Sequence, residues 1–322
     1  MLDEHIVRGV DLLTDIFLHS TFPEGDLEKE KRIIKEEIKM VEDSPDDYIH
    51  DLFYQAVWGP DGIGQPVLGK RETIKSFGRN DLIGHIRKYY GTKDTVIACA
   101  GNFDADKLLK DLNHALGGLR RGSEPKTGGI PEFRATNVVY SKDLSEAHVC
   151  IGVRGIPQAS DERFALYLLN TILGASVSSR LFQEIREKRG LAYSIYSFIA
   201  SYIDVGILGV YAGTAGKRVL ETIDLVLKEM RQLRDTITGD ELKRAKDQLK
   251  GNLLLGLEST SNRMQNIARQ EIYYGRYFPP EEIIKDIDAV DLEQIKSLAG
   301  KLIRDDGVAI TVFGPVPPSL LS

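Results

Sequence analysis

The chain has 322 residues, of which 42% are hydrophobic and 28% charged, with a net charge of −6. These values are ordinary for a globular protein of about two domains. The charge is spread along the chain without a long basic block, which argues against nucleic acid or an anionic membrane as a partner. Cys99 and Cys150 stand in apolar runs. They predict buried, reduced thiols and exclude a disulfide framework.

The chain contains no apolar run of about 18 residues, so no membrane span is predicted. Its first residues, MLDEHIVRGVDLLTDIF, begin directly on an amphipathic helical pattern and lack the layout of a signal peptide. We expect a cytoplasmic protein, unless residues ahead of Met1 carry a signal. The opening also resembles the inside of a domain rather than its beginning.

The first 116 residues predict mostly helices. Apolar spacing and turn residues indicate helices over 2–17, 26–41, 48–57, 79–90 and 105–116. A Gly/Pro loop covers 58–69. One β-like run, Thr95 to Ala100, is closed by Gly101 and Asn102.

The clearest linker is GGLRRGSEPKTGGIP, 117–131, which has five glycines, two prolines and no apolar periodicity. It predicts a first domain over 1–116, a linker over 117–135 and a second domain over 136–322. The second domain predicts strands over 137–140, 148–154, 193–201, 206–214 and 308–313. It also predicts helices over 161–173, 179–188 and 217–234, and a long helix after a capping box formed by Thr238 and Glu241.

The two ends of the chain resemble each other. KRIIKEEIK aligns with KRAKDQLK when one residue is skipped, and NDLIGHIRKYYGTKDTVIACAGN aligns with VDLEQIKSLAGKLIRDDGVAITVFGP with a short gap. This indicates an internal duplication with a period of about 200 residues. The second copy has a strand-rich front half, roughly 136 to 237, whereas the first copy has almost none. The fold class is therefore α+β with an incomplete first domain.

Two pairs of residues could carry chemistry. Glu30 and Glu37 are seven residues apart, so both lie on one helix face together with Ile34. A carboxylate pair on a partly apolar face needs a ligand, a partner or a proton; alternatively, both are exposed and pair with lysines along the helix. Arg186 and Tyr193 bracket a turn that leads into a strand. Together they could hydrogen-bond a peptide carbonyl or an oxyanion, or they are simply a surface arginine and a strand tyrosine.

The six histidines, at 5, 19, 50, 85, 114 and 148, include no pair at i and i+4. A catalytic zinc site needs two or three nitrogen or oxygen ligands at fixed spacing and an open coordination position. His50, in YIHDLF, is the histidine nearest in sequence to the glutamate pair, and we interpret it as a packed or surface residue. Glu4-His5 resembles the end of an H-x-x-E-H motif, but Met1 occupies the position of the first histidine.

The segments EKRIIKEEIKMVEDSPDDYIHDLF, GQPVLGKRETIKSF and VIACAGNFD resemble the M16 (insulinase, or pitrilysin-like) zinc peptidases. The segments SSRLFQEIREKRGLAYSIYSF and QLKGNLLLGLESTSNRMQNIAR extend the resemblance to the second domain. It covers essentially the whole chain and is greatest to bacterial processing proteases akin to the mitochondrial processing peptidase β subunit.

The resemblance implies an H-x-x-E-H motif whose two histidines bind Zn²⁺ and whose glutamate is the general base. It also implies Glu37 as the third zinc ligand, Glu30 as a supporting acid, and Arg186 and Tyr193 as substrate-binding residues. The motif is absent here. In the family it precedes the glutamate ligand by roughly 75 residues, which would put its second histidine about 38 residues before Met1. This spacing argues against His5 as that ligand.

Three hypotheses follow. The first is a zinc endopeptidase whose chain begins late, inactive alone because H-x-x-E-H is absent. The second is a non-catalytic partner that supplies Arg186 and Tyr193 to a zinc-bearing M16 chain. The third is a structural protein like the core subunits of a respiratory complex. We expect an extended peptide substrate along a sheet edge, a homodimer or heterodimer with another M16 chain, and an exposed apolar patch on the incomplete first domain.

Overall fold

The computed structural model describes residues 1–93, 95–122 and 129–321. Its contacts divide the chain into two units. The first comprises Met1–Ile38, Leu68–Gly128 and Gly256–Tyr277, and the second comprises Lys39–Val67, Gly129–Leu255 and Phe278–Ser322. The predicted linker falls partly on residues 123–128, which lie outside the described residues.

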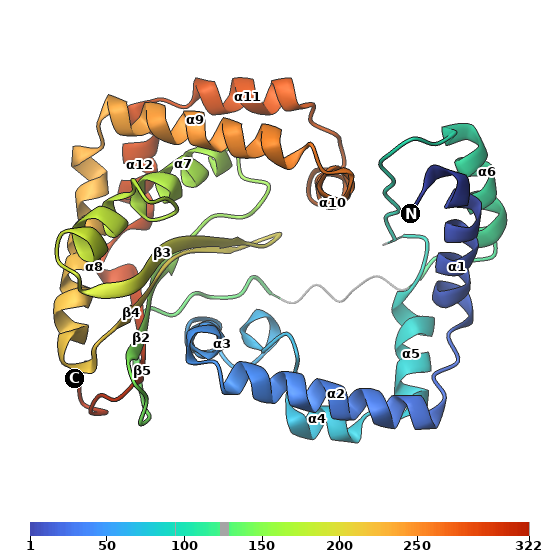
Figure 1. Cartoon of the computed structure of the whole chain (residues 1–322), viewed down its shortest axis with the longest axis horizontal. Coiled ribbons are helices and arrows are strands. Elements are labelled where there is room, and N and C mark those ends of the chain that lie inside the picture. Colours follow the sequence, from blue (N-terminus) through green and yellow to red (C-terminus); the bar gives the residue numbers. More distant parts are fainter. Residues whose placement is uncertain (94, 123–128, 322) are drawn as a thin grey trace. The chain divides into compact units, whose positions relative to one another are not determined.

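The second unit is built on a five-stranded sheet (Figure 1). Its strands are β1 (Asn137–Ser141), β2 (Ala147–Arg154), β3 (Ala192–Ser201), β4 (Gly206–Thr214) and β5 (Val308–Gly314). Their order is β1-β5-β2-β4-β3; β1 and β5 are parallel and the other neighbours antiparallel. The five strands predicted from alternation and turn residues are therefore confirmed. Because β3 lies at an edge, a segment that leads into it stands at the border of the sheet.

Helices cover one face of this sheet. They are α7 (Arg163–Leu173), α8 (Val219–Thr236), α9 (Gly239–Gly256), α11 (Pro280–Ala289) and α12 (Leu292–Leu302). Side chains alternate between the faces of a strand, so Val149, Ile151 and Val153 of β2 face these helices in the main core. Thr238 and Glu241 form the predicted reciprocal cap at the start of α9.

Helix α3 (Pro45–Trp58) lies on the other face of the sheet. Its buried residues pack with Cys150, Ile207 and Phe313 in a second apolar cluster. Gly152 of β2 permits this approach, because a Cβ there would lie 2.7 Å from Cζ of Phe53. Although α3 belongs to the region predicted as the first domain, its packing is within the second unit.

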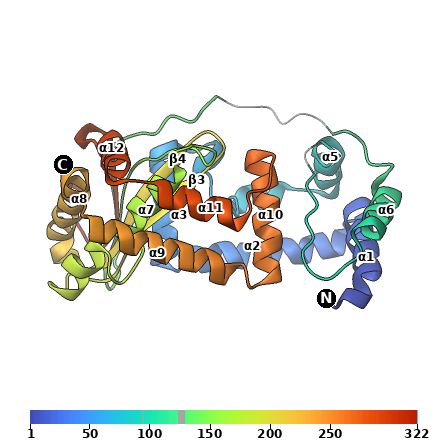
Figure 2. The ribbon, with the colours of Figure 1, turned by 90° about the horizontal axis from the view of Figure 1, so that it is seen from above.

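The first unit consists of helices among the described residues: α1 (Ile6–His19), most of α2 (Glu24–Glu42), α4 (Arg71–Ser76), α5 (Arg79–Tyr89), α6 (Ala105–Leu116) and α10 (Thr260–Tyr274). Helices α1 and α6 lie side by side in both views (Figures 1 and 2). Helix α4 is not predicted by the sequence pattern. The described residues also form four short 3-10 turns: Asp3–His5, Gly62–Gly64, Gly216–Arg218 and Asp305–Gly307.

The strand predicted over Thr95 to Ala100 is wrong. The segment is described without strand pairing, and no backbone hydrogen bond of residues 96–100 to another described residue is found. An apolar run becomes a strand only when a neighbouring strand satisfies its amides and carbonyls. The described residues of the first unit provide no such neighbour.

The first unit exposes much of its apolar surface, as expected from the sequence. Among the described residues, Ile38 is its single buried apolar side chain. Exposed ones include Val7, Leu12, Leu13, Ile16, Ile33, Val96 and Ile97. A groove of about 620 Å³ runs between α1, α6 and residues 95–103. In the described part of the chain, no helix is long and apolar enough to cross a bilayer.

Candidate functional site

Arg186 and Tyr193 lie against each other in the second unit. The guanidinium carbon of Arg186 is 5.1 Å from the centroid of the Tyr193 ring and 4.8 Å from that of Phe182. Both distances are within the range of cation–π attraction. Tyr193 is 82% exposed, so its phenol is open to a ligand. The structure thus brings together two residues that are seven positions apart.

Two backbone irregularities place this pair. Arg186 lies in a π-helix, η3 (Phe182–Glu187), within the short helix predicted over 179–188. Tyr193 is the extra residue of a β-bulge, because Ala192 pairs with Thr214 and Ser194 with the preceding Gly213. π-Turns and β-bulges often occur at functional sites, where they re-aim a side chain. The bulge and the π-turn therefore direct the two side chains toward each other.

The charges around the pair leave Arg186 available. Glu184 accepts from both Lys188 and Arg189, the latter at 2.7 Å. The hydrogen bond from Lys188, followed by that from Arg189, lowers the pKa of the Glu184 carboxyl. Arg186 has aromatic neighbours but no carboxylate partner within the described sequence. Its guanidinium donors can therefore bind a peptide carbonyl, a carboxylate or a developing oxyanion.

Glu30 and Glu37 lie on α2 in the first unit, and both are exposed. Seven residues of helix separate them by about 10 Å along the axis. On the same helix, Asp26 pairs with Lys29 at 3.1 Å and Glu28 pairs with Lys31 at 2.7 Å. Glu30 and Glu37 have no hydrogen bond or ion pair to any other described residue. The alternative in which they form ordinary Glu–Lys pairs is thus not seen.

The residues present do not make a zinc site. Across residues 1–93, 95–122 and 129–321, no three His, Cys, Asp or Glu side chains lie where they could share a metal ion. Glu37 offers one carboxylate, and His5 contacts Glu4, at 3.6 Å, rather than a second histidine. Zinc in proteins takes three or four such ligands. Glu37 alone does not fit the ion.

The internal alignment shows which residues of the second copy correspond to Glu30 and Glu37. Skipping one residue of the first copy between Arg32 and Lys35, as the lysines require, pairs Glu37 with Gln248 and Glu30 with Leu242. Gln248 lies on α9, the counterpart of α2. An amide is a weak ligand for Zn²⁺ and a leucine is none. The carboxylate pair is therefore particular to the first copy.

A cluster between α3 and the sheet is not predicted from the sequence. His50 Nε2 lies 3.0 Å from the Tyr196 hydroxyl and its Nδ1 lies 3.9 Å from Sγ of Cys150. Its ring also contacts Phe198 and Tyr211. Burial lowers the pKa of His50 and raises that of Tyr196 to about 12. His50 is thus packed; the alternating aromatic residues of β3 are the sequence signal that could indicate its surroundings.

Comparison with known proteins supplies the family. The profile described as "Insulinase (Peptidase family M16)" matches residues 1–71, and that of "Peptidase M16 inactive domain" matches residues 76–249. A Bacillus subtilis relative, "Uncharacterized zinc protease YmxG", is 39% identical over 318 residues, which are 98% of this chain and 77% of the relative. The chain belongs to peptidase family M16. A second relative, a Streptomyces coelicolor "Uncharacterized zinc protease", is 33% identical, with 98% of this chain and 71% of the relative covered.

Solved structures show the M16 fold of the chain. A chain of "Complex III2 from Candida albicans, Inz-5 bound" has a TM-score of 0.87 at 24% identity, covering 98% of this chain and 78% of that one. A peptidase M16 inactive domain from Pseudomonas fluorescens has a TM-score of 0.87 at 21% identity, covering 95% and 74%. These likenesses establish the architecture, and the α+β class predicted from the sequence is confirmed.

Proposed function

We propose that this chain binds an extended peptide substrate through Arg186 and Tyr193 as part of a zinc-dependent M16 endopeptidase of the processing type. The observation that carries the proposal is the Arg186–Tyr193 pair itself. An arginine to which the described residues offer no carboxylate lies over an exposed tyrosine at an edge of the sheet. A guanidinium and a phenol in this arrangement present several donors to peptide carbonyls.

Zinc belongs to the proposal only as a property of a complete site. Glu37 would be one ligand, and the two histidines would come from residues outside this sequence. Glu30, on the same helix face, would support Glu37. The described residues do not hold the ion by themselves.

A second candidate is a non-catalytic partner that lends Arg186 and Tyr193 to another M16 chain that binds zinc. The match of residues 76–249 to an inactive domain favours it. The exposed apolar surface of the first unit also favours a second M16 chain, as a homodimer or heterodimer partner. In this case Glu37 would have no role in hydrolysis.

Peptide binding is the first test, because it does not need the metal. Fluorescence anisotropy of a labelled unstructured peptide would be measured on the chain as it stands. Removing a hydrogen bond from a charged group costs about 1.5–3 kcal/mol, so Arg186→Ala should weaken binding by about 10-fold or more. Tyr193→Phe keeps the ring and should cost less. Arg189→Ala, which removes a cation already paired with Glu184, is the matched control.

Hydrolysis then separates the two candidates. The chain would be assayed with an H-x-x-E-H segment fused ahead of Met1 and, separately, mixed with a zinc-bearing M16 chain. If the chain supplies the third ligand, Glu37→Gln abolishes hydrolysis by the fusion. If it is a partner, Glu37→Gln is silent in the mixture while Arg186→Ala is not. Equal peptide affinity of Arg186→Ala and the parent chain would refute both candidates.

A further inference from the structure

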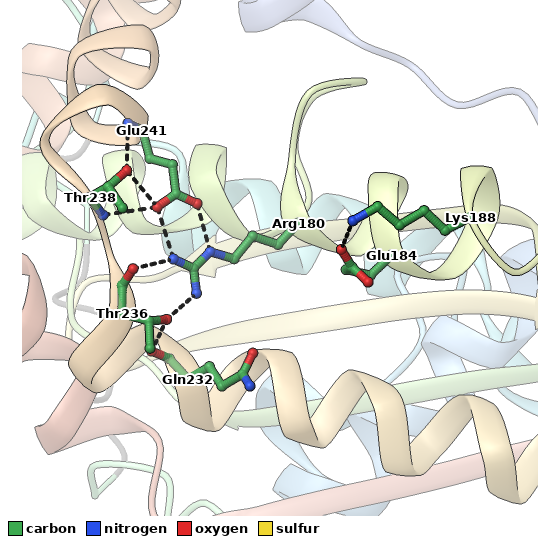
Figure 3. Close-up of polar contacts among 7 residues, drawn as sticks. All are labelled: Arg180, Glu184, Lys188, Gln232, Thr236, Thr238 and Glu241. Atoms are coloured by element: carbon green, nitrogen blue, oxygen red, sulfur yellow. Dashed lines mark hydrogen bonds and ion pairs between the residues drawn. The ribbon is translucent and has the colours of Figure 1, made fainter.

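Arg180, at the start of the segment that carries Arg186, is fixed by four hydrogen bonds (Figure 3). Its Nε and Nη2 donate to the two carboxylate oxygens of Glu241 at 2.7 and 2.9 Å. Its Nη1 donates to the Thr236 hydroxyl at 2.7 Å, and Nη2 also donates to the Thr236 carbonyl at 2.8 Å. The Arg180 and Glu241 side chains are only 14% and 18% exposed. We name this group, Arg180 with Glu241 and Thr236, the Arg180 clamp.

The acceptors of the clamp are themselves held. Glu241 Oε2 accepts from the backbone N–H of Thr238 at 2.9 Å and from its hydroxyl at 3.1 Å. Burial raises the pKa of the Glu241 carboxyl, but the hydrogen bonds from Arg180 and Thr238 outweigh burial and keep the pKa below its ordinary value. Thr236 is the last residue of α8, and Glu241 lies in the first turn of α9. The clamp therefore ties the segment to the α8–α9 corner.

The tied segment is the one that places Arg186. Leu181 and Ile185 are fully buried, so apolar packing holds its inner side. The π-helix follows immediately, and its wide turn brings Arg186 over the Phe182 ring, four residues earlier. The segment has three other cations. Two of them, Lys188 and Arg189, follow Arg186 and are paired with Glu184. Arg180 instead pairs outside the segment, with Glu241 on α9 and Thr236 on α8.

We propose that Arg180 is a positioning residue of the peptide-binding site, and that the Arg180 clamp keeps the π-helix placed so that Arg186 stays over Tyr193. The inference rests on the proposed function. A planar fork is required because one side chain must reach a carboxylate, a hydroxyl and a carbonyl at once. Lysine would keep the charge but not this set of contacts.

The test uses the whole chain with Arg180→Lys as the main variant. Peptide affinity should fall by about 10-fold, which corresponds to 1.4 kcal/mol. Thr236→Val is the milder variant, since it removes one acceptor and keeps the ion pair, and it should give a smaller loss in the same direction. Arg231→Lys is the matched control, because Arg231, on α8, likewise forms an ion pair with an acid outside its own element, Asp305, at 2.7 Å. It should bind peptide as the parent does.

Two further readouts separate positioning from general stability. In a double-mutant cycle, Arg180→Lys should cost no further affinity once Arg186 is alanine. In protein labelled with ¹⁵N-arginine, the Nε–H resonance of Arg186, identified by its loss in Arg186→Lys, should move in Arg180→Lys as it leaves the two rings. An unmoved resonance, or additive losses in the cycle, would overturn the clamp. A resonance that moves while Arg186→Ala binds peptide normally would instead overturn the proposed function, and the clamp's role in it.

Discussion

Residues 96–101 and 309–314 are counterparts in the two copies of the internal repeat, yet they have different structures. VIACAG is extended and unpaired in the first unit, and Ile97 is 53% exposed. AITVFG forms most of β5, between β1 and β2, and Ile310 is 7% exposed. The two runs have similar apolar content. The neighbouring strands, rather than the apolar run itself, therefore decide whether the segment forms a strand.

The glycine that ends each segment has the same backbone conformation in both copies. The closing glycines, Gly101 and Gly314, have φ values of +142° and +153°. L-residues rarely adopt this region, so glycine is needed at both positions. The glycine itself thus determines the backbone conformation at the end of each segment, whereas strand formation in the preceding residues depends on neighbouring strands.

The two copies should differ most when a charge is placed at the matched isoleucines, Ile97 and Ile310. Ile310→Asp buries an unpaired carboxylate in the main core and should destabilise the second unit by about 3 kcal/mol or more. Ile97→Asp should change stability by less than about 0.5 kcal/mol. Trp58, the single tryptophan, is 6% exposed in the second unit and reports its unfolding in urea by fluorescence.

Ile97→Asp has a second use as a probe of the first unit. Sedimentation velocity should show less self-association than in the parent chain, because the substitution breaks an exposed apolar surface. Equal urea midpoints for Ile97→Asp and Ile310→Asp would contradict the contrast between the two segments.

The closing glycines should give the next largest contrast. In Gly314→Ala, the new Cβ would lie 2.6 Å from Cα of Ala147 and 2.9 Å from the Glu146 carbonyl oxygen. Backbone strain and this clash together should cost about 3 kcal/mol. Gly101→Ala meets nothing within 4 Å, so it carries the strain alone. The Trp58 transition should shift for Gly314→Ala and stay in place for Gly101→Ala; two equal shifts would be the contrary result.

Periodicity and turn residues predict most of the fold, because most elements are amphipathic and their partners are in the chain. The span of α6 and the capping box at Glu241 match the structure closely. The prediction fails at Thr95 to Ala100, where no partner strand is described. At η3 the helix is predicted but its π type is not. A π-turn has the same residue types as an α-turn, so nothing in the sequence separates them.

The candidate site is predictable as residues but not as geometry. Family resemblance selects Glu30, Glu37, Arg186 and Tyr193, and their roles remain predictions. The stacking of Arg186 on Tyr193 depends on the bulge in β3, which only the strand register reveals. The Arg180 clamp joins positions about 60 residues apart, beyond the reach of any local pattern.

A smaller effect is expected from pH in the second unit. Burial lowers the pKa of His50 and His148, against the opposing effect of Asp46 on both, Asp47 on His50 and Glu146 on His148. The uncharged groups facing them are Tyr196, Tyr211 and Cys150. The folded state thus favours the neutral imidazoles. The contribution of the neutral imidazoles to the free energy of unfolding is present above the pKa of histidine in the unfolded chain, about 6.5. It is lost as the pH falls through the lower pKa values that these histidines have in the folded state.

Urea titrations followed by Trp58 at pH 7.5 and 5.5 would measure this loss. His50→Gln cannot take up the proton and should reduce the difference between the two pH values. His19→Gln, an exposed histidine paired with Asp15 in the first unit, is the control and should leave the difference unchanged. A difference that is the same in His50→Gln and the parent chain would exclude His50 as a source.

The two cysteines offer the mildest probe, one in each unit. Cys99 lies in the unpaired segment and is partly exposed, whereas Cys150 lies on β2 beneath α3 and is completely buried. Only a thiolate attacks a disulfide reagent, and burial raises the pKa of Cys150. One thiol should therefore react in native protein, and Cys99→Ser should remove that reaction. The Cys150 thiol should react only as fast as α3 separates from the sheet. The thiolate fraction of Cys150 falls at lower pH, which by itself slows the reaction. If protonation of His50 loosens α3, the rate at pH 5.5 should exceed the rate that this fraction predicts. Two thiols reacting together would mean that α3 is as open as the unpaired segment.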